Sequence, residues 1–352
     1  MAEMNEMTEQ RKIPGFGEAF TSHMMTMAWN ADAGWHGLKL LPYGNLPMNP
    51  AMVTLHYGQA IFEGLKAHRQ ADGSIALFRP DKHALRFQLS AQRVAMPQLP
   101  ADVFLEAVET MVRADGPELP DDPALSLYLR PFMFASEATL AVRPAREYLF
   151  AVIACVTGGF FGSQSKPLSV MVSHRYSRAA PGGTGAAKFA GNYAASYAAQ
   201  LEAAEAGCQQ VVWLDAVEYQ WIEELGATNI FFVRGHGQGA RVLTPELTGT
   251  LLSGVTRDSI LTLAAELGYL PSEERLSVDQ WREQSRSGVI TESFACGTAA
   301  VVTPIGHVRD PGGDWTIGDG TPGPVTLALH DALVSVHRGR AADRHHWMHK
   351  VC

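Results

Sequence analysis

The feature that most constrains the fold is a series of short apolar segments in the second half of the chain. From residue 209 onward, "QQVVWL", "YQWIEE", "NIFFV" and "ARVLTP" follow one another, separated by turns such as "GHGQG". Short segments rich in Val, Ile, Phe and Trp and bounded by Gly are typical of strands, and strands joined by short turns form antiparallel meanders. Helical patterns lie around these strands without a regular βα alternation, so we predict an α+β fold rather than a doubly wound sheet.

The first half predicts a separate group of strands and one long helix. "SIALFRP", "LSLYLRPFMF" and "EYLFAVIACV" read as strands, and "DKHALRFQLSAQR" reads as a helix with Asp81 as its N-cap. The Gly- and Ser-rich stretch "TGGFFGSQSKP" is the expected linker between two domains. We therefore expect a small N-terminal domain, a linker and a large C-terminal domain, at residues 1–156 (with 1–30 as a weakly ordered leader), 157–167 and 168–352.

Composition narrows the class of protein. A chain of 352 residues is long enough for two domains, and its formal charge of −8 argues against a nucleic-acid partner. The longest apolar run, residues 148–156, is too short to span a bilayer, which requires about 20 residues, and the start lacks the apolar core of a signal peptide. Four cysteines without a CxxC spacing fit a reducing compartment. We expect a cytoplasmic protein with free, non-catalytic thiols and no membrane partner.

One lysine stands out between a glycine-rich turn and an alanine-rich segment, in "PGGTGAAKFAGNYAASYAAQ". The stretch lacks the Gly-Lys pair of a phosphate-binding P-loop and the third glycine of a dinucleotide fingerprint. A surface lysine is the plain alternative, but Gly, Ala, Phe and Tyr surround Lys188. Desolvation in such surroundings lowers the pKa of an amine and favours its attack on a carbonyl, as in a Schiff base.

The residues after Lys188 predict a helix. Asn192 is the expected N-cap, and Tyr193, Tyr197 and Leu201 form an apolar stripe with a spacing of four, ending before Gly207. We expect this stripe to face the core.

The lysine segment resembles that of the branched-chain aminotransferases, which belong to the fold type IV enzymes dependent on pyridoxal 5′-phosphate. Further segments resemble the same family in the same order: "LHYGQAIFEGLKA", "LFRPDKHALRFQLSAQRVAMP", "LYLRP", "EELGATNIFF", "LLSGVTRDSI" and "CGTAAVVTP". The resemblance covers residues from about 50 to 304. It implies a small α/β domain, a larger antiparallel pseudo-barrel domain and a homodimer.

The resemblance also implies which residues bind the cofactor. Lys188 would form the Schiff base and then move the substrate proton, and Glu224 would pair with the pyridine nitrogen. Its neighbour Glu223 should point the other way and is the better candidate for a solvated carboxylate. Arg79 does not align with the family's phosphate arginine. The remaining matches to cofactor-binding positions are Arg86, Val255, Thr256 and Thr298 for the phosphate and Tyr193 for the ring oxygen.

Substrate-binding positions follow from the same resemblance. Phe62 and Tyr57 would form an apolar wall, while Tyr128 and Arg130 would bind carboxylates. The backbone N–H groups of Thr298 and Ala299 would do the same, and Tyr57 and the loop near Val142 would line the neighbouring subunit's site.

The expected reaction is transamination of L-leucine, L-isoleucine or L-valine with 2-oxoglutarate. Two alternatives stay open: a D-amino acid aminotransferase or aminodeoxychorismate lyase of the same fold type, and a non-catalytic relative that acts as a binding protein. The histidines of the tail "HRGRAADRHHWMHKVC" lack a helical ligand spacing, so we expect no metal.

Overall fold

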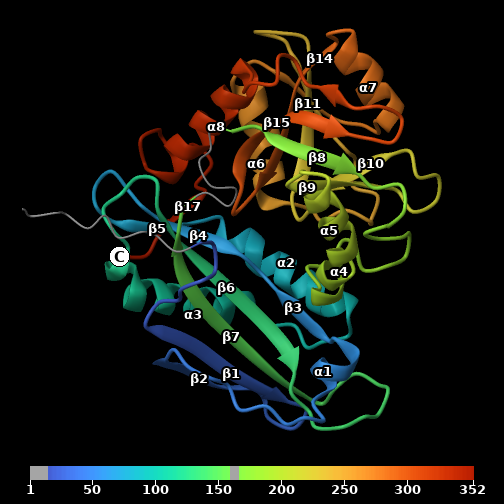
Figure 1. Cartoon of the computed structure of the whole chain (residues 1–352). Helices are drawn as coiled ribbons and strands as arrows, with labels where there is room; N and C mark the ends of the chain where they lie inside the picture. Colours follow the sequence, from blue (N-terminus) through green and yellow to red (C-terminus); the bar gives the residue numbers. More distant parts are fainter. Residues whose placement is uncertain (1–14, 159–165) are drawn as a thin grey trace, which may run out of the picture.

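The computed structural model describes residues 15–158 and 166–352, which fold around two sheets. The first sheet, in the lower half of Figure 1, has the strand order β17-β5-β4-β6-β7-β1-β2 with β3 paired to β6. Neighbouring strands in this sheet run antiparallel. Its strands are β1 (His23–Asn30), β2 (Gly34–Pro42), β3 (Ala60–Phe62), β4 (Leu65–Arg69), β5 (Ile75–Phe78), β6 (Ser126–Ala135), β7 (Glu147–Thr157) and β17 (Met348–Lys350).

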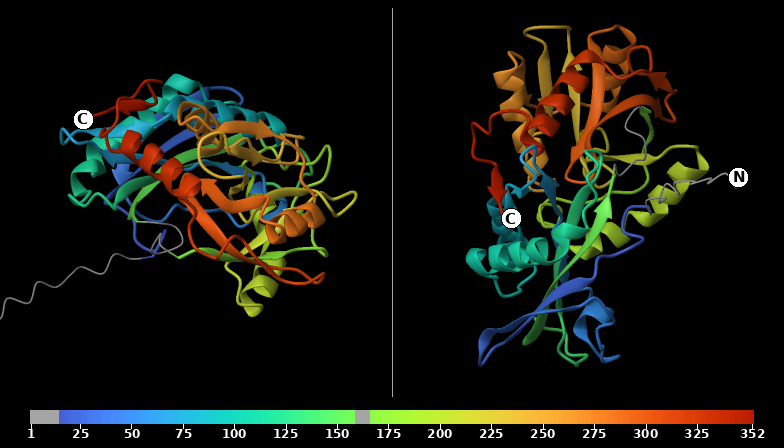
Figure 2. Two further views of the ribbon diagram at one scale, coloured as in Figure 1. Left: turned by 90° about the horizontal axis from the view of Figure 1, so that it is seen from above. Right: turned by 90° about the vertical axis from the view of Figure 1, so that its left-hand side faces the viewer.

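Helices cover one face of this sheet. Phe87, Phe104 and Phe150 are fully buried and contact one another, which joins α2, α3 and β7 in one core. The right-hand view of Figure 2 shows these helices, in cyan and teal, beside the strands. The helix predicted to have Asp81 as its N-cap starts two residues earlier, with Arg79 in the N-cap position and Pro80 as its first residue. The helices of this half are α1 (Val53–Tyr57), α2 (Pro80–Arg93), α3 (Ala101–Asp115) and the 3-10 turn η1 (Gly116–Glu118).

The second sheet has the order β10-β9-β8-β15-β14-β11-β12-β13, with β16 on β15. The hairpins β9–β10 and β11–β12 are antiparallel, as the turn spacing predicted. The expected single meander of these four strands is nevertheless wrong, because β9, β8, β15 and β14 lie between β10 and β11 in the sheet. Three pairs in this sheet are parallel: β8–β9, β8–β15 and β12–β13. Helices join β8 to β9 and β12 to β13, and such crossovers return the chain in the same direction. The strands are β8 (Leu168–Val172), β9 (Gln210–Leu214), β10 (Ile222–Leu225), β11 (Asn229–Arg234), β12 (Arg241–Thr244), β13 (Leu270–Glu273), β14 (Ile290–Gly297), β15 (Val301–Arg309) and β16 (Trp315–Thr316).

Both faces of the second sheet are buried. Phe231 packs on one side with Phe294, while its neighbour Phe232 packs on the other side against Trp281 of α7. This explains why "NIFFV" is a continuous apolar run rather than an alternating one. The helices of this half are α4 (Ala190–Ala194), α5 (Tyr197–Glu205), α6 (Val255–Glu266), α7 (Val278–Arg286) and α8 (Pro324–His337).

Strands from both ends of the chain join the first sheet, and one expectation about the chain ends is wrong. Residues 23–30, predicted to be part of a weakly ordered leader, form β1 between β2 and β7, and Met24, Met25 and Met27 are buried there. Methionine gives a weak strand signal, so pairing with distant residues decides this segment. At the other end, β17 leaves the second half and pairs with β5 of the first sheet. Most of the predicted linker, residues 159–165, and residues 1–14 of the leader lie outside the described residues, and the domain boundaries stay predictions.

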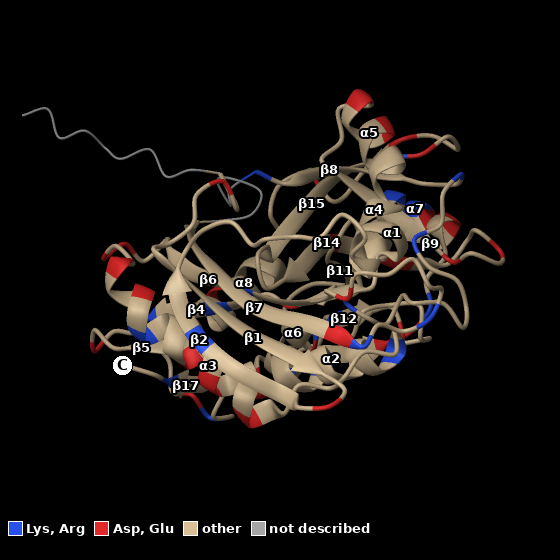
Figure 3. Ribbon diagram, turned by 90° about the horizontal axis from the view of Figure 1, so that it is seen from below, with Lys and Arg blue, Asp and Glu red and all other residues tan. Residues whose placement is uncertain are grey.

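Within the described residues, no helix is long and apolar enough to cross a membrane. In these two ranges, residues 15–158 and 166–352, no group of three or more His, Cys, Asp or Glu side chains is arranged to hold a metal ion. Figure 3 shows Lys and Arg interspersed with Asp and Glu on the face that it presents.

Candidate active site

A cavity of about 310 Å³ lies between the two sheets, within the size range of small-molecule sites. Both halves of the chain contribute to it, because Phe62 comes from β3 of the first sheet and Glu224 from β10 of the second. Most of the residues that the sequence singled out line this cavity: Phe62, Arg86, Tyr128, Arg130, Lys188, Tyr193, Glu224, Val255, Thr256, Thr298 and Ala299.

Lys188 follows the glycine-rich turn, and its amine lies next to the hydroxyl of Tyr193. Its Nζ donates to the hydroxyl of Tyr193 at 3.0 Å, and its backbone N–H donates to Ser90 of α2 at 2.9 Å. The turn passes very close to another segment, since a Cβ on Gly185 would lie 2.1 Å from the carbonyl oxygen of Thr250. Only glycine allows this approach. Gly185 therefore lets the turn before Lys188 pack directly against the backbone of Thr250, and this packing positions Lys188.

The helix after Lys188 differs from the prediction. Asn192 lies inside α4 rather than capping it, and its side-chain amide donates to the carbonyls of Thr184 and Ala187. Tyr193 faces the cavity, but Tyr197 and Leu201 are 61% and 67% exposed, so the expected core stripe is wrong. The segment forms two helices instead of one, since α4 ends at Ala194 and α5 begins at Tyr197, and Ala199 and Ala203 form the buried face of α5.

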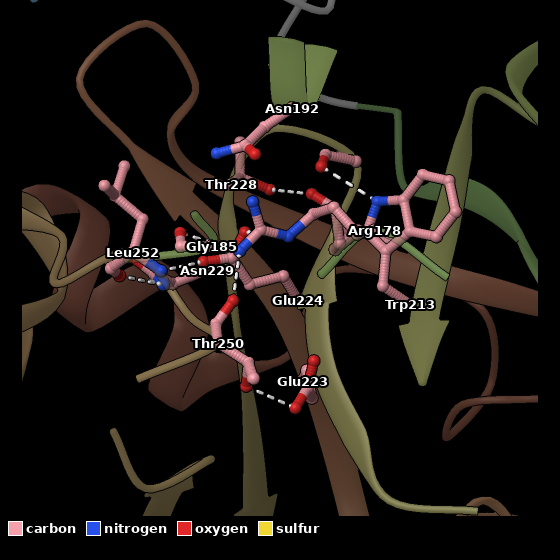
Figure 4. A network of polar contacts seen from close by, with 12 residues as sticks. Arg178, Gly185, Asn192, Trp213, Glu223, Glu224, Thr228, Asn229, Thr250 and Leu252 are labelled. Carbon is pink, nitrogen blue, oxygen red and sulfur yellow. Dashed lines mark hydrogen bonds and ion pairs between the residues drawn. The ribbon is translucent and has the colours of Figure 1, made fainter. Parts of the chain in front are cut away.

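Two adjacent carboxylates on β10 have different surroundings. Glu224 lines the cavity at 3% exposure, and its Oε2 lies 3.0 Å from Nε of Arg178, while the backbone N–H of Leu252 donates to its other oxygen. Burial raises the pKa of Glu224, and the charge of Arg178 opposes this rise. Figure 4 shows the guanidinium of Arg178 beside the carboxylate. Glu224 is thus a desolvated carboxylate held next to one cation.

The expectation of a solvated Glu223 is wrong. Glu223 is 6% exposed, and it accepts a hydrogen bond from the hydroxyl of Thr250, as Figure 4 shows. It does face away from the cavity, as the alternation of a strand predicts, but packed segments cover that side as well. Burial raises the pKa of Glu223 too, and its hydrogen bond with Thr250 opposes the rise.

Sequence reasoning missed Arg178. Besides its contact with Glu224, this side chain donates from Nη2 to the carbonyl oxygens of Thr250 at 2.6 Å and Gly185 at 3.1 Å. It thus ties the lysine turn, β10 and the segment before α6 together. Its only sequence signal is an arginine shortly before the glycine-rich turn, in "SRAAPGG".

Arg86 of α2 is held by a second buried ion pair. Its Nε and Nη2 donate to the two oxygens of Glu63 at 2.6 and 2.8 Å, and Nη1 donates to the carbonyl of Ser253 at 3.1 Å. Glu63 is fully buried and also lies 2.8 Å from Nδ1 of His83. Burial alone would raise the pKa of Glu63, but the charge and hydrogen bonds of Arg86, helped by His83, hold it well below its usual range. The only indication of this clamp in the sequence is the glutamate of "FEGLK".

The start of α6 forms the end of the cavity beyond Arg86. The helix begins at Val255 after Gly254, without a side-chain cap, and Val255 and Thr256 line the cavity. The first N–H groups of a helix have no partner within the helix and favour an anion. A Cβ on Gly254 would lie 2.0 Å from the side chain of Asn229, so glycine is needed here. Arg86 and this helix end together suit a phosphate group.

Tyr128 and Arg130 of β6 also line the cavity. Arg130 donates to the hydroxyl of Tyr128 at 3.0 Å, and its guanidinium lies 4.6 Å from the centre of the Phe62 ring. A Cβ on Gly64 would lie 1.9 Å from the same hydroxyl, so the glycine of "FEG" makes room for Tyr128. This part of the cavity combines an aromatic wall with a cation.

The turn between β14 and β15 carries Thr298 and Ala299, both on the cavity wall. Lys66, which sequence reasoning missed, donates to the carbonyl of Ala299 at 3.3 Å and is 4% exposed. Burial lowers the pKa of Lys66 to about 8.

Tyr57 and Val142 are the exceptions among the predicted residues. They lie together outside the cavity of their own chain, where the hydroxyl of Tyr57 donates to the carbonyl of Leu140 at 2.7 Å. Their exposed fractions are 45% and 86%. The structure therefore does not place Tyr57 on the apolar wall beside Phe62, and their assignment to a neighbouring subunit stays a prediction.

Comparison with known proteins shows the family to which this chain belongs. The family model described as amino-transferase class IV matches residues 60–308. A branched-chain-amino-acid aminotransferase of Mycolicibacterium smegmatis is 52% identical over 96% of this chain and 92% of its own length. The chain therefore belongs to the class IV aminotransferase family, as the sequence predicted.

Solved structures agree in fold. The branched-chain amino acid aminotransferase of Escherichia coli superposes with a TM-score of 0.77 at 28% identity, over 94% of this chain and 100% of that one. The branched-chain amino acid aminotransferase of Thermobaculum terrenum in its PLP-bound holo form gives a TM-score of 0.74 at 25% identity, over 95% and 99%. The predicted α+β, two-domain fold type IV architecture is confirmed.

Proposed function

We propose that this chain transfers the amino group of L-leucine, L-isoleucine or L-valine to 2-oxoglutarate, giving branched-chain 2-oxo acids and L-glutamate, with pyridoxal 5′-phosphate as cofactor. The observation that carries the proposal is the meeting of Lys188, Tyr193 and the buried Glu224 in one cavity with Arg86 and the start of α6. The similarity to relatives named branched-chain-amino-acid aminotransferases supports the choice of substrates.

The cavity fits this cofactor group by group. Lys188 offers an amine for the aldehyde, and Glu224, a carboxylate with Arg178 as its only ion-pair partner in the described residues, is suited to a ring nitrogen. The hydroxyl of Tyr193 lies next to the amine of Lys188, where it could donate a hydrogen bond to the ring oxygen of the cofactor. Arg86 and the N–H groups of Val255 and Thr256, with the hydroxyl of Thr298, suit the phosphate. Every predicted cofactor position lies on the wall of this cavity.

In the proposed mechanism, the bound cofactor supplies an electron sink for the carbanion at the substrate Cα. Lys188 removes the proton from Cα as a base and then delivers it as an acid, and the second half-reaction runs the same transfer in reverse. The Tyr193 hydroxyl, 3.0 Å from Nζ, orients the amine. Glu224 holds a negative charge where a protonated ring nitrogen needs one, and Arg178 keeps that carboxylate in place. The two half-reactions alternate, so the kinetics are ping-pong.

We propose that Phe62, Tyr128 and Arg130, which line the cavity, select the substrate. The Phe62 ring provides an apolar surface for the branched side chain, where each buried CH₂ contributes about 0.8 kcal/mol. Arg130 and Tyr128 give the carboxylate of glutamate a charged partner, because an unpaired carboxylate in an apolar site is costly. The N–H groups of Thr298 and Ala299 are the proposed second carboxylate site.

The first test uses Lys188→Ala, with the exposed Lys82→Ala on α2 as matched control. Wild-type protein loaded with pyridoxal 5′-phosphate should show a visible absorption band that L-leucine removes. The Lys188→Ala protein should lack both the band and turnover, while Lys82→Ala should keep them. A Lys188→Ala protein with an intact, leucine-responsive band would disprove the assignment.

The same assay separates the alternatives. A D-amino acid aminotransferase would respond to D-alanine and not to L-leucine, and a non-catalytic relative would stay colourless with added cofactor. Aminodeoxychorismate lyase activity would release pyruvate from its own substrate without any need for 2-oxoglutarate.

We further propose a cytoplasmic homodimer, with the small domain at residues 1–156 and the large domain at 168–352. The exposed position of Tyr57 and Val142, outside their own cavity, supports a role at the site of a second subunit. The free cysteines among the described residues fit a reducing compartment. Sedimentation would give the oligomeric state, and a monomer with full activity would contradict the shared site.

A further inference from the structure

Arg79 connects the two elements that form the proposed phosphate site, although it lies outside the cavity itself. Its backbone starts α2, the helix that carries Arg86, and its side chain reaches the first turn of α6. The sequence singled out Arg79 only as an arginine that does not align with the phosphate position. Its contacts in the structure give it a different role.

The backbone of Arg79 adopts an unusual conformation. It is the N-cap of α2 with φ 46° and ψ 50°, in the left-handed region that a residue with a Cβ seldom occupies. Three backbone hydrogen bonds hold it there: its N–H donates to the carbonyl of Trp347 at 2.7 Å, and its carbonyl accepts from the N–H groups of Lys82 at 3.2 Å and His83 at 3.4 Å. Strain of this kind persists where surrounding contacts require it and is often found near functional sites.

The side chain of Arg79 makes three contacts with the start of α6. Nη1 donates to the hydroxyl of Ser259 at 2.7 Å and lies 3.5 Å from the carbonyl of Val255, while Nη2 pairs with Asp258 at 2.6 Å. Val255 and Thr256, the two residues whose N–H groups are proposed to bind the phosphate, both line the cavity. The carbonyl of Val255 that Arg79 contacts belongs to the same peptide unit as the N–H of Thr256, so the arginine touches the backbone of the proposed anion site.

Burial makes these contacts matter. Arg79 is 6% exposed, and its guanidinium lies 5.0 Å from the centre of the Trp347 ring, which covers it. The pair with Asp258 is open to solvent on the aspartate side, at 61% exposure, and contributes little. The bond with the buried Ser259 is the stronger restraint, because a charged donor inside the protein has no water to replace its partner.

We propose that Arg79 is a positioning residue that sets the distance and register between Arg86 on α2 and the N-terminus of α6, and so tunes the affinity of the site for a phosphate group. The inference rests on the proposed function, since it takes the cavity as the site of pyridoxal 5′-phosphate. It assigns Arg79 no contact with the ligand. Its effect is therefore expected in the binding of the phosphate group rather than in the binding of the ring.

The test compares two probes on full-length protein freed of cofactor: pyridoxal 5′-phosphate and pyridoxal, which lacks the phosphate. Dissociation constants come from the visible absorption of the bound probe, and the attachment to Lys188 is common to both. Arg79→Met should reduce the preference for the phosphorylated probe by about tenfold or more, with pyridoxal affinity almost unchanged. Arg79→Lys should recover part of the preference, since lysine keeps the positive charge but cannot contact Ser259 and Asp258 with two separate nitrogens as the guanidinium does.

Two further variants complete the design. Ser259→Ala removes the buried acceptor of Arg79, together with the hydrogen bond that the Ser259 hydroxyl donates to the carbonyl of Val255 within α6. It should lower the preference in the same direction by less, which keeps the test decisive if Arg79→Met does not fold. Arg282→Met is the matched control, because Arg282 also combines carboxylate partners, Asp279 and Asp310, with a tryptophan ring, Trp315, but lies outside the cavity. It should leave the preference unchanged.

The outcomes separate the two proposals. Wild-type protein without any preference for the phosphorylated probe would contradict the proposed function, and this inference with it. A wild-type preference that Arg79→Met retains, or an equal loss of affinity for both probes, would overturn the role of Arg79 alone.

Discussion

The cavity contains two buried arginine–glutamate pairs that are alike in composition and opposite in arrangement. In the first, Arg86 faces the cavity and Glu63 stands behind it. In the second, Glu224 and Arg178 both line the cavity. The first pair thus presents only its cation to the cavity, whereas the second pair also presents its carboxylate.

The geometry of the two pairs differs accordingly. Glu63 receives a two-point contact from Arg86 and a further contact from His83, so its charge is strongly stabilised. Glu224 receives one contact from Arg178 and one backbone N–H, and its pKa is raised by burial. A carboxylate that serves as support is fully satisfied, whereas a carboxylate that serves as a site keeps capacity for a ligand.

The largest effect is expected from Glu63→Gln. The change removes the charge that matches buried Arg86, and breaking one partner of a buried pair destabilises a protein by about 3–5 kcal/mol. Urea unfolding of the two proteins measures this difference. Glu137→Gln is the matched control, because Glu137 also makes two contacts with an arginine, Arg143, at the surface, where about 1 kcal/mol or less is expected. Equal losses for the two variants would show that burial of the Glu63 pair has no special weight.

Glu224→Gln should act on turnover instead. An amide cannot supply the negative charge opposite a protonated ring nitrogen, and loss of one preorganised electrostatic group commonly lowers kcat by about 10²–10³-fold. Steady-state transamination of L-leucine gives kcat and KM separately. The adjacent Glu223→Gln is the matched control, since Glu223 is similarly buried but faces away from the cavity. If both variants lost turnover alike, the assignment of Glu224 to the cofactor would fail.

The sequence predicted the residues that face the cavity better than those that support them. Lys188, Tyr193, Glu224 and Arg86 stand in segments that resemble the family, so each could be named from its neighbours in the chain. The contacts of Glu63 with Arg86, Arg178 with Thr250 and Arg79 with Ser259 join residues 23, 72 and 180 positions apart, and no local pattern encodes such distances. The same holds for the fold, where the hairpins were predictable from turn spacing but the pairing of β1 and β17 depended on distant strands.

The smallest effect is also the one that separates the two carboxylates most directly: their pH dependences should have opposite signs. Glu63 has a pKa below its ordinary value of 4.5 when folded, so the unfolded chain takes up this proton first as the pH falls. The stabilisation from Glu63 is then complete above about pH 5.5 and is lost at lower pH, relative to Glu63→Gln. Glu224 has a raised pKa when folded, so the folded protein takes up its proton first. Wild-type stability should therefore increase, relative to Glu224→Gln, as the pH falls toward 4.5.

Urea unfolding of cofactor-free wild-type and variant proteins between about pH 4 and about pH 7 measures both slopes, each at most about 1.4 kcal/mol per pH unit for one proton. Differences between wild type and variant remove the contribution of all other titrating groups. Slopes of the same sign would mean that Arg178 neutralises the effect of burial on Glu224 as fully as Arg86 does on Glu63. Glu63 and Glu224 would then differ only in whether the carboxylate lines the cavity, and not in how strongly its charge is stabilised.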